Sequence, residues 1–426
     1  MRRLIQGVGR MVASLCWVAG LALLASPSTI TPADTFGVRL STVASQGRFD
    51  MVAWIGGAML GKVQDRLGGD LARMDEAGRD ALVKRYFQLA REEEDLRAKA
   101  LQSRAKLAPA AELQALEAQI VSKRADKLAL EHQAEAILSE RVEHAAQSAG
   151  LAQDLPLNPQ IVFPPVAFKY VEPPLLLVMS PHEKIEQKKT VHLQSSLVLS
   201  QIEQAEAAAD QLGVVSLVVP IGGVGTYPTM VLATSSYEVS VDIVSHEWTH
   251  NYLDIRPLGW HYGDNGNLIS INETVANIVG HELSLRVQGL PPPSYDDLPP
   301  ATFNREPSPP GTFDFNREMR LTRLQVDDLL KEGKVQEAET YMEARRREFV
   351  AHGYALRKLN QAYFAFYGSY ADGGVGTVNP IGRELKQLRR MSGSLKEFLD
   401  TVARLSTFDE YLALLKEKGV EPGKRG

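Results

Sequence analysis

The sequence predicts an α+β fold that is mostly helical, and three observations support this class. Apolar residues recur at helical or heptad spacing from 64 to 148, which indicates an N-terminal helical hairpin. Short runs rich in Val, Leu and Tyr between 155 and 237 indicate a small mixed sheet. Helical patterns return over 237–287 and after 318, so we expect two helices beside the sheet and a helical C-terminal part.

Length and composition are those of a globular protein with two or three structural units. The chain has 426 residues, and single cores stop growing at roughly 250 to 300 residues. Hydrophobic residues make up 44% and charged residues 23%, which argues against both disorder and a polytopic membrane protein. The formal net charge is -5 and no basic cluster is interleaved with aromatics, so no nucleic acid partner is expected.

Residues 1–30 are predicted to be a signal peptide or a membrane anchor. Three arginines within the first ten residues precede an uncharged, mostly apolar run, Met11–Ala25. The run is shorter than the roughly 20 residues of a spanning helix, which favours cleavage, whereas Leu23 stands where a cleavage site needs a small residue. Both alternatives place the body outside the cytoplasmic membrane, secreted or anchored to it, so that membrane is an expected partner of this segment.

The chain contains a single cysteine, Cys16, which lies inside that apolar run. The remaining sequence therefore offers no disulfide framework and no thiolate for a metal site or a nucleophile. Any metal bound by the body of this protein must use His, Asp or Glu side chains.

Composition changes along the chain divide the body into four parts. We assign a helical hairpin or coiled region to 31–150, with a break at Pro109. Its charged positions are interpreted as solvated faces, and a dimerising coiled coil is the alternative. The central core is assigned to 151–289, a proline-rich loop to 290–320, and the helical C-terminal part to 321–426.

An H-E-x-x-H pattern, His246-Glu247-Trp248-Thr249-His250, lies within the first of the two central helices. Residues four apart lie on one face of a helix, so both imidazoles can reach a single zinc ion. Glu247, one residue further round, can then act as the base that takes a proton from the attacking water. The alternative is that the two histidines belong to the core, with their hydrogen bonds satisfied there and no metal bound.

The third metal ligand is predicted to be Glu273. A catalytic zinc site takes three protein ligands and leaves a fourth position open. Glu273 opens a second apolar helix and forms a polar stripe on it with Asn277 and His281, which a buried helix tolerates only if the stripe meets partners. Small residues beside the stripe would let the two helices approach. Four other side chains could compete for the metal: Asp254, Asp264, His281 and Glu282.

HEWTH followed downstream by NETVAN resembles the gluzincin metallopeptidases, the group of thermolysin and the aminopeptidase N family, over residues 214–285. The resemblance implies a bacterial, exported or membrane-anchored member with a zincin-like domain, in which 151–289 is the zinc metallopeptidase core. It implies one Zn²⁺ ion held by His246, His250 and Glu273, with Glu247 as the catalytic base. Asn277 stands where these enzymes use an aspartate to orient the first histidine.

The resemblance also implies an exposed edge strand before the zinc helix, where an extended peptide pairs. Tyr227–Thr234 takes that place here, so Tyr227, Thr229 and Met230 are the expected substrate-binding residues. The alternative is an ordinary edge strand shielded by the loop at Gly222. No Gly-x-Met-Glu-Asn motif of the aminopeptidase N family occurs, which leaves exopeptidase and endopeptidase activity both open.

The oxyanion of the transition state needs a donor, usually Tyr or His. Tyr367 and Tyr370 are predicted for this catalytic role because they lie near the end of a helical pattern, just before a glycine-rich loop. His261 and Tyr262, in the loop between the two zinc helices, are further candidates. The alternative for the tyrosines is an aromatic stripe in the core.

The sequence thus predicts zinc-dependent hydrolysis of peptide bonds outside the cytoplasmic membrane, with water activated by zinc and Glu247 and with a peptide or protein as substrate. The alternative is a membrane-associated helical interaction protein whose zinc site is structural or inactive. No oligomeric state follows from the sequence.

Overall fold

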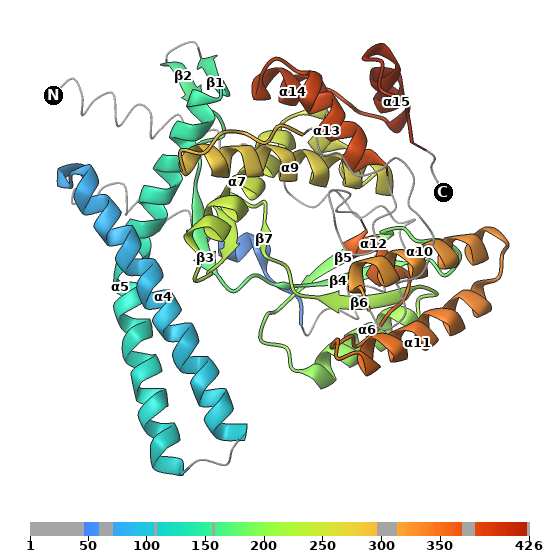
Figure 1. Ribbon diagram of the computed structural model, residues 1–426, viewed down its shortest axis with the longest axis horizontal. Helices are drawn as coiled ribbons and strands as arrows, with labels where there is room; N and C mark the ends of the chain where they lie inside the picture. The colour runs from blue at the N-terminus through green and yellow to red at the C-terminus, as the bar shows by residue number, and fades with distance from the viewer. Residues whose placement is uncertain are drawn as a thin grey trace. The chain divides into compact units, whose positions relative to one another are not determined.

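The computed structural model describes residues 47–58, 71–105, 109–155, 158–295, 313–368 and 380–423. Within these ranges helices dominate and the strands form small sheets, so the α+β, mostly helical class is confirmed (Figure 1). The predicted signal or anchor at 1–30 and most of the predicted proline-rich loop lie outside the described residues. None of the helices described here has the length and apolarity needed to cross a membrane.

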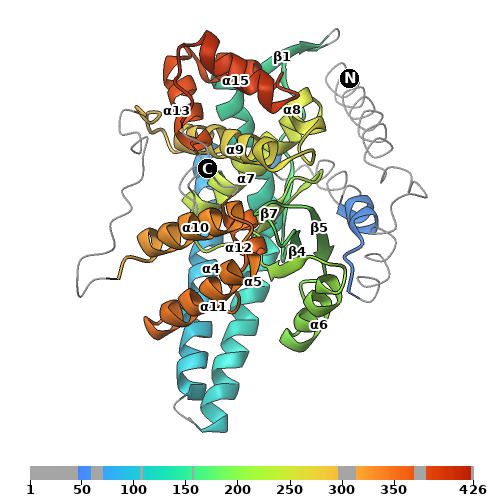
Figure 2. The same ribbon diagram turned by 90° about the vertical axis from the view of Figure 1, so that its right-hand side faces the viewer.

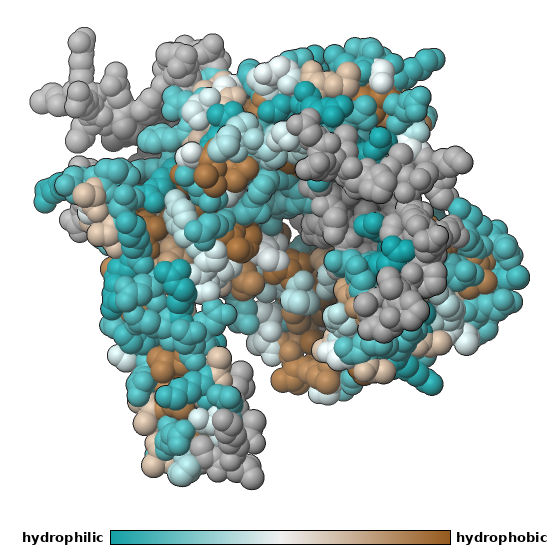
Figure 3. All heavy atoms as spheres, in the orientation of Figure 1, coloured by the Kyte–Doolittle hydropathy of each residue, from teal (hydrophilic) through white to brown (hydrophobic). Residues whose placement is uncertain are grey.

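The N-terminal hairpin consists of α4 (Glu76–Ala105) and α5 (Ala110–Ser148), which lie along each other (Figure 1). A 3-10 turn, η1 (Leu71–Arg73), comes before it, and Pro109 caps α5, where its fixed φ suits the start of a helix. The exposed surface of the hairpin is largely hydrophilic in Figure 3, as the solvated-face interpretation expects.

Glu135 fastens the hairpin to the central part of the molecule. This residue of α5 is fully buried, and its Oε1 accepts a hydrogen bond of 2.7 Å from the backbone N–H of Tyr170 in β3 (Phe168–Val171). β3 lies at the edge of its sheet, so the carboxylate satisfies a donor that an edge strand would otherwise leave open. The hairpin base therefore covers one side of that sheet.

The strands form three separate sheets, where the sequence predicts one. The first is an antiparallel pair, β1 (Ala152–Leu155) and β2 (Asn158–Val162). The second has the order β3-β8-β7, with β8 (Thr229–Leu232) parallel to β3 and antiparallel to β7 (Gly223–Val224). The third is antiparallel, with the order β5-β4-β6, made of β5 (Lys189–Leu193), β4 (Leu175–Ser180) and β6 (Val215–Val219).

The prediction that residues 227–234 form an edge strand is wrong. β8 lies between β3 and β7 and pairs with both, so its backbone has no free side for a peptide. Thr229 and Met230 are 2% and 0% exposed, because β8 packs against the helix that carries the H-E-x-x-H motif. Tyr227 is half-buried just before the strand. Within the described residues the edge strands of this sheet are β3, which α5 contacts, and β7, which comes from the segment predicted as the loop at Gly222.

Two hydrophobic cores hold these elements. One core joins the hairpin, the β3-β8-β7 sheet and the two central helices to three C-terminal helices, α13 (Ile381–Met391), α14 (Leu395–Val402) and α15 (Phe408–Glu417). The other joins the β5-β4-β6 sheet to α10 (Phe315–Lys331), α11 (Val335–Ala351) and α12 (Gln361–Tyr367). Figure 2 shows α12 beside β4, and α10 begins inside the range predicted as a proline-rich loop.

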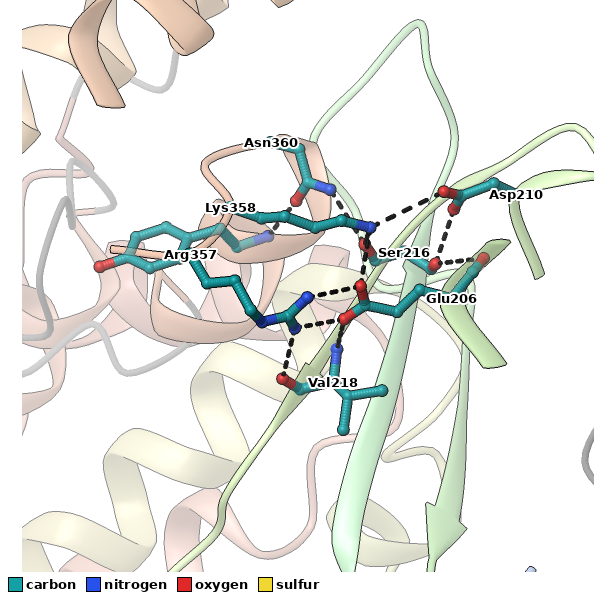
Figure 4. Close-up of polar contacts among 8 residues, drawn as sticks. Glu206, Asp210, Ser216, Val218, Arg357, Lys358 and Asn360 are labelled. Atoms are coloured by element: carbon teal, nitrogen blue, oxygen red, sulfur yellow. Dashed lines mark hydrogen bonds and ion pairs between the residues drawn. The ribbon is translucent and has the colours of Figure 1, made fainter. Parts of the chain in front are cut away.

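A buried carboxylate ties α6 (Leu199–Asp210) to the segment before α12 (Figure 4). Glu206 accepts hydrogen bonds from Arg357 at 2.7 Å and from the backbone N–H of Val218 at 2.7 Å, and pairs with Lys358 at 2.8 Å. Burial acts to raise the pKa of Glu206, but Arg357 and Lys358 outweigh it and hold that pKa below its ordinary value. Every charge in this cluster is paired, so its role is structural.

Candidate metal centre

Two helices carry the candidate metal ligands, α7 (Tyr237–Asp254) and α9 (Gly266–Val287), with the short α8 (Pro257–Trp260) between them. Ser236 caps α7 by accepting from the N–H of Val239, as expected from its position. α9 begins at Gly266, capped by Asn265, and not at Glu273 as predicted. Glu273 therefore lies in the middle of a rigid helix.

The two helices cross in contact at His246. A Cβ placed on Gly280 of α9 would lie 2.7 Å from the backbone nitrogen of His246 and 2.8 Å from its Cα. Only glycine permits this approach, since real Cβ contacts are longer. The close crossing brings a carboxylate of α9 within reach of the histidines of α7.

His246, His250 and Glu273 converge on one point. The Nε2 atoms of His246 and His250 lie 3.1 Å apart. Glu273 Oε2 lies 3.7 Å from His246 Nε2 and 3.6 Å from His250 Nε2. Ligand atoms held at 2.0 to 2.2 Å by a tetrahedral zinc ion lie roughly 3.3 to 3.6 Å from one another. The three side chains are the one group of this kind found among the described residues.

The hydrogen bonding of Glu273 Oε2 also agrees with a role as a metal ligand. This oxygen is buried and has no hydrogen-bond partner, because both imidazole nitrogens are too far away to donate. An ionised oxygen in this state needs a cation nearby. Without metal the protonated His250 at 3.6 Å is that cation, and a metal ion bound between the three side chains could take its place. Two imidazoles with one carboxylate form a ligand set typical of zinc. This group could therefore hold a metal ion.

Asn272 fixes the tautomer of His250. Its amide nitrogen donates to the carbonyl of Leu258 at 3.4 Å, so its Oδ1 faces the imidazole and accepts from His250 Nδ1–H at 2.8 Å. His250 Nε2 then keeps its lone pair for the centre of the site. Sequence reasoning missed this role, although Asn272 stands directly before Glu273 in the NETVAN motif. Asn277, predicted to orient the first histidine, lies near enough to His246 to act on its pKa, in the direction that raises it.

Burial and mutual charge shift the pKa values of the group. Burial lowers the pKa of His246 to about 4, helped by the charge on His250. Burial acts in the same direction on His250, but the Glu273 carboxylate outweighs it and raises the pKa of His250 to about 10. Burial would raise the pKa of Glu273, yet the attraction of His250 lowers it to about 2. Without metal, His250 is therefore protonated on both nitrogens and Glu273 is ionised, and His250 Nε2 has its lone pair free only after it loses a proton.

Glu247 lies beside the ligands without belonging to their group. It is 8% exposed, and burial raises its pKa to about 7, against the opposing effect of His250. The backbone of β7 lies directly over it, since a Cβ on Gly223 would lie 2.5 Å from Glu247 Oε1. Gly225 lies over His250 in the same way, since a Cβ on Gly225 would lie 2.9 Å from the Cβ of His250. The glycine segment 222–226 thus forms a roof over the motif helix.

Of the two tyrosines predicted as oxyanion donors, the structure describes only Tyr367, and it packs among other aromatic rings. Tyr367 packs its ring at 4.6 Å from Tyr363 and 5.0 Å from Phe366 in the second core, which matches the aromatic-stripe alternative. Tyr370 lies outside the described residues. Tyr262 is the tyrosine at the site, where its hydroxyl donates to Glu273 Oε1 at 2.6 Å.

Of the competing ligands, three are engaged elsewhere, and Asp254 lies outside the group although its charge acts on His250 and Glu247. Asp264 accepts from His261, and His281 pairs with Asp242 on the surface. Glu282 is buried in an ion pair with Arg389, and Asp254 is the exposed last residue of α7.

Comparison with models of known protein families, with curated proteins and with solved structures found no match. The resemblance to gluzincins therefore rests on the two motifs and on nothing larger. A proposal of function has to rest on the geometry of the site itself.

Proposed function

We propose that the protein is a zinc-dependent peptidase of the gluzincin type that hydrolyses peptide bonds of peptide or protein substrates outside the cytoplasmic membrane. One observation carries the proposal: three side chains of a zinc ligand set converge beside a buried carboxylate that is not part of their group. A structural zinc site is normally closed by four protein ligands, whereas three ligands leave a position for chemistry. The extracytoplasmic location rests on the sequence of residues 1–30 alone.

Each residue has a distinct task in the proposed mechanism. His246, His250 and Glu273 would hold the ion, which when bound supplies a Lewis acid that polarises the scissile carbonyl and acidifies water. Glu247 takes the proton of the attacking water and passes it to the leaving amine. Burial raises the pKa of Glu247, and this favours the transfer of a proton from water to its carboxylate.

For the substrate we propose the outer strand β7 in place of β8. β7 contacts the motif helix and lies over Glu247, so a peptide paired with it would run past the base. Pairing by main-chain hydrogen bonds positions an extended peptide without demanding a particular side chain.

Two isosteric variants test the proposal. Glu247→Gln keeps the shape of the base but cannot take a proton, so zinc content should remain parental while peptide-library hydrolysis falls by about 10² to 10⁴. Glu273→Gln replaces a ligand by a poor one, so zinc itself should be lost. Parental hydrolysis by Glu247→Gln with zinc in place would overturn the peptidase and favour the helical interaction protein.

A further inference from the structure

The two oxygens of Glu273 have different surroundings. Oε1 accepts a hydrogen bond from the hydroxyl of Tyr262 at 2.6 Å, while Oε2 is buried without a hydrogen bond and faces both imidazole nitrogens. A carboxylate can bind a metal through one oxygen or through both. The hydrogen bond to Oε1 therefore determines which mode is available.

Tyr262 is held in place by the turn that carries it. A Cβ on Gly259 would lie 2.2 Å from the carbonyl oxygen of Leu253, so α8 rests directly on the end of α7. Leu258 is fully buried and its N–H donates to Ala403, and the N–H of Tyr262 donates back to Gly259 at 3.1 Å. These contacts fix the backbone that carries Tyr262, while the residue as a whole is 37% exposed.

The same turn acts on a second ligand. The carbonyl of Leu258 accepts from Asn272, which orients His250, and the ring of Tyr262 meets the ring of His250 edge-on at 6.3 Å. One short helix thus supports the outer contacts of both His250 and Glu273. Outer contacts of this kind set ligand orientation and basicity.

We propose that Tyr262 is a positioning residue that keeps Glu273 a one-oxygen ligand, so that the fourth position of the metal stays open for substrate chemistry. The inference rests on the metal site of the proposed function. With its hydroxyl present, Oε1 is occupied and only Oε2 is presented to the ion. Without the hydroxyl, the carboxylate would be free to turn, and both of its oxygens could then bind the metal and fill the open position.

The test uses the full chain loaded with one equivalent of Co²⁺, whose visible absorption is strong in four-coordinate sites and weak in sites of higher coordination number. Tyr262→Phe keeps the ring and removes the hydroxyl, so its visible bands should lose intensity. Trp260→Phe is the matched control, since Trp260 lies on the same turn and is 66% exposed; its spectrum should stay parental.

Each outcome separates this inference from the peptidase. If Tyr262→Phe keeps the parental cobalt spectrum, the positioning role is wrong, whatever the protein hydrolyses. Should the parent bind cobalt and respond to the variant as expected yet cleave no peptide, the inference holds and the peptidase fails. A parent that binds neither metal overturns both.

Discussion

The roof over Glu247 can be tested by adding one methyl group. In Gly223→Ala the new Cβ would lie 2.5 Å from Glu247 Oε1, 2.7 Å from its Cδ and 2.8 Å from its Cγ. Gly223 does not have a positive φ, so alanine meets no backbone strain there. The perturbation therefore acts first on the side chain of Glu247, the proposed base.

The size of the effect follows from these distances. Ordinary contact begins near 3.4 Å, so the carboxylate or β7 must move by about 0.6 to 0.9 Å. Glu247 is buried and cannot swing into solvent at no cost. A misplacement of about 1 Å in a catalytic group can cost about 10²-fold in rate, so turnover should fall by about 10- to 10²-fold. Zinc should remain bound, because the three atoms nearest to the new Cβ all belong to Glu247, which is not one of the three ligands.

Gly222→Ala is the matched control, since a Cβ at the neighbouring glycine meets nothing within 4 Å. The assay compares hydrolysis of a peptide library, zinc content and thermal unfolding of the parent and both variants. Gly222→Ala should match the parent in all three. Parental turnover in Gly223→Ala, or an equal loss in Gly222→Ala, would refute the packing of β7 on the base.

Two further predictions follow from the metal centre. Metal affinity should rise about tenfold per pH unit between about pH 7 and 9, because His250, whose pKa is about 10 without metal, must release a proton on binding; a flat profile in competition with a chelating dye would contradict this protonation state. Gly280→Ala should lower the free energy of unfolding by about 1 to 3 kcal/mol and weaken metal binding, since its Cβ would strike the backbone of His246. Chemical denaturation measures the first effect, and unchanged stability would show that the helices do not cross so closely.

The sequence predicted the parts of the site that a single helix dictates. His246 and His250 share a face because the helical period requires it, and a carboxylate in the next apolar helix had to find a partner. The small residue Gly280 correctly indicated where the helices approach. These inferences needed only local periodicity and the cost of burying charge.

Contacts set by tertiary pairing were not predictable in this way. A strand of apolar residues reads alike whether it is the edge of a sheet or its middle, so β8 was placed wrongly. Tyr262 and Tyr367 both belong to aromatic-rich segments, and only the fold brings one to Glu273 and the other into a core. The cap at Asn265 does carry a local signal, an Asn before the apolar helix, which would have corrected the start of α9.

The glycines around the motif carry information that a flexible-loop interpretation discards. Gly213 and Gly289 have positive φ, where glycine serves the backbone. Gly223, Gly225 and Gly280 do not have positive φ. A Cβ added at each of them would lie within 3 Å of an atom of the H-E-x-x-H motif. Their absent side chains let backbone exclude water from the motif, and this exclusion is the burial that raises the pKa of Glu247. Glycine at these positions is therefore a requirement of the proposed chemistry, transmitted through packing.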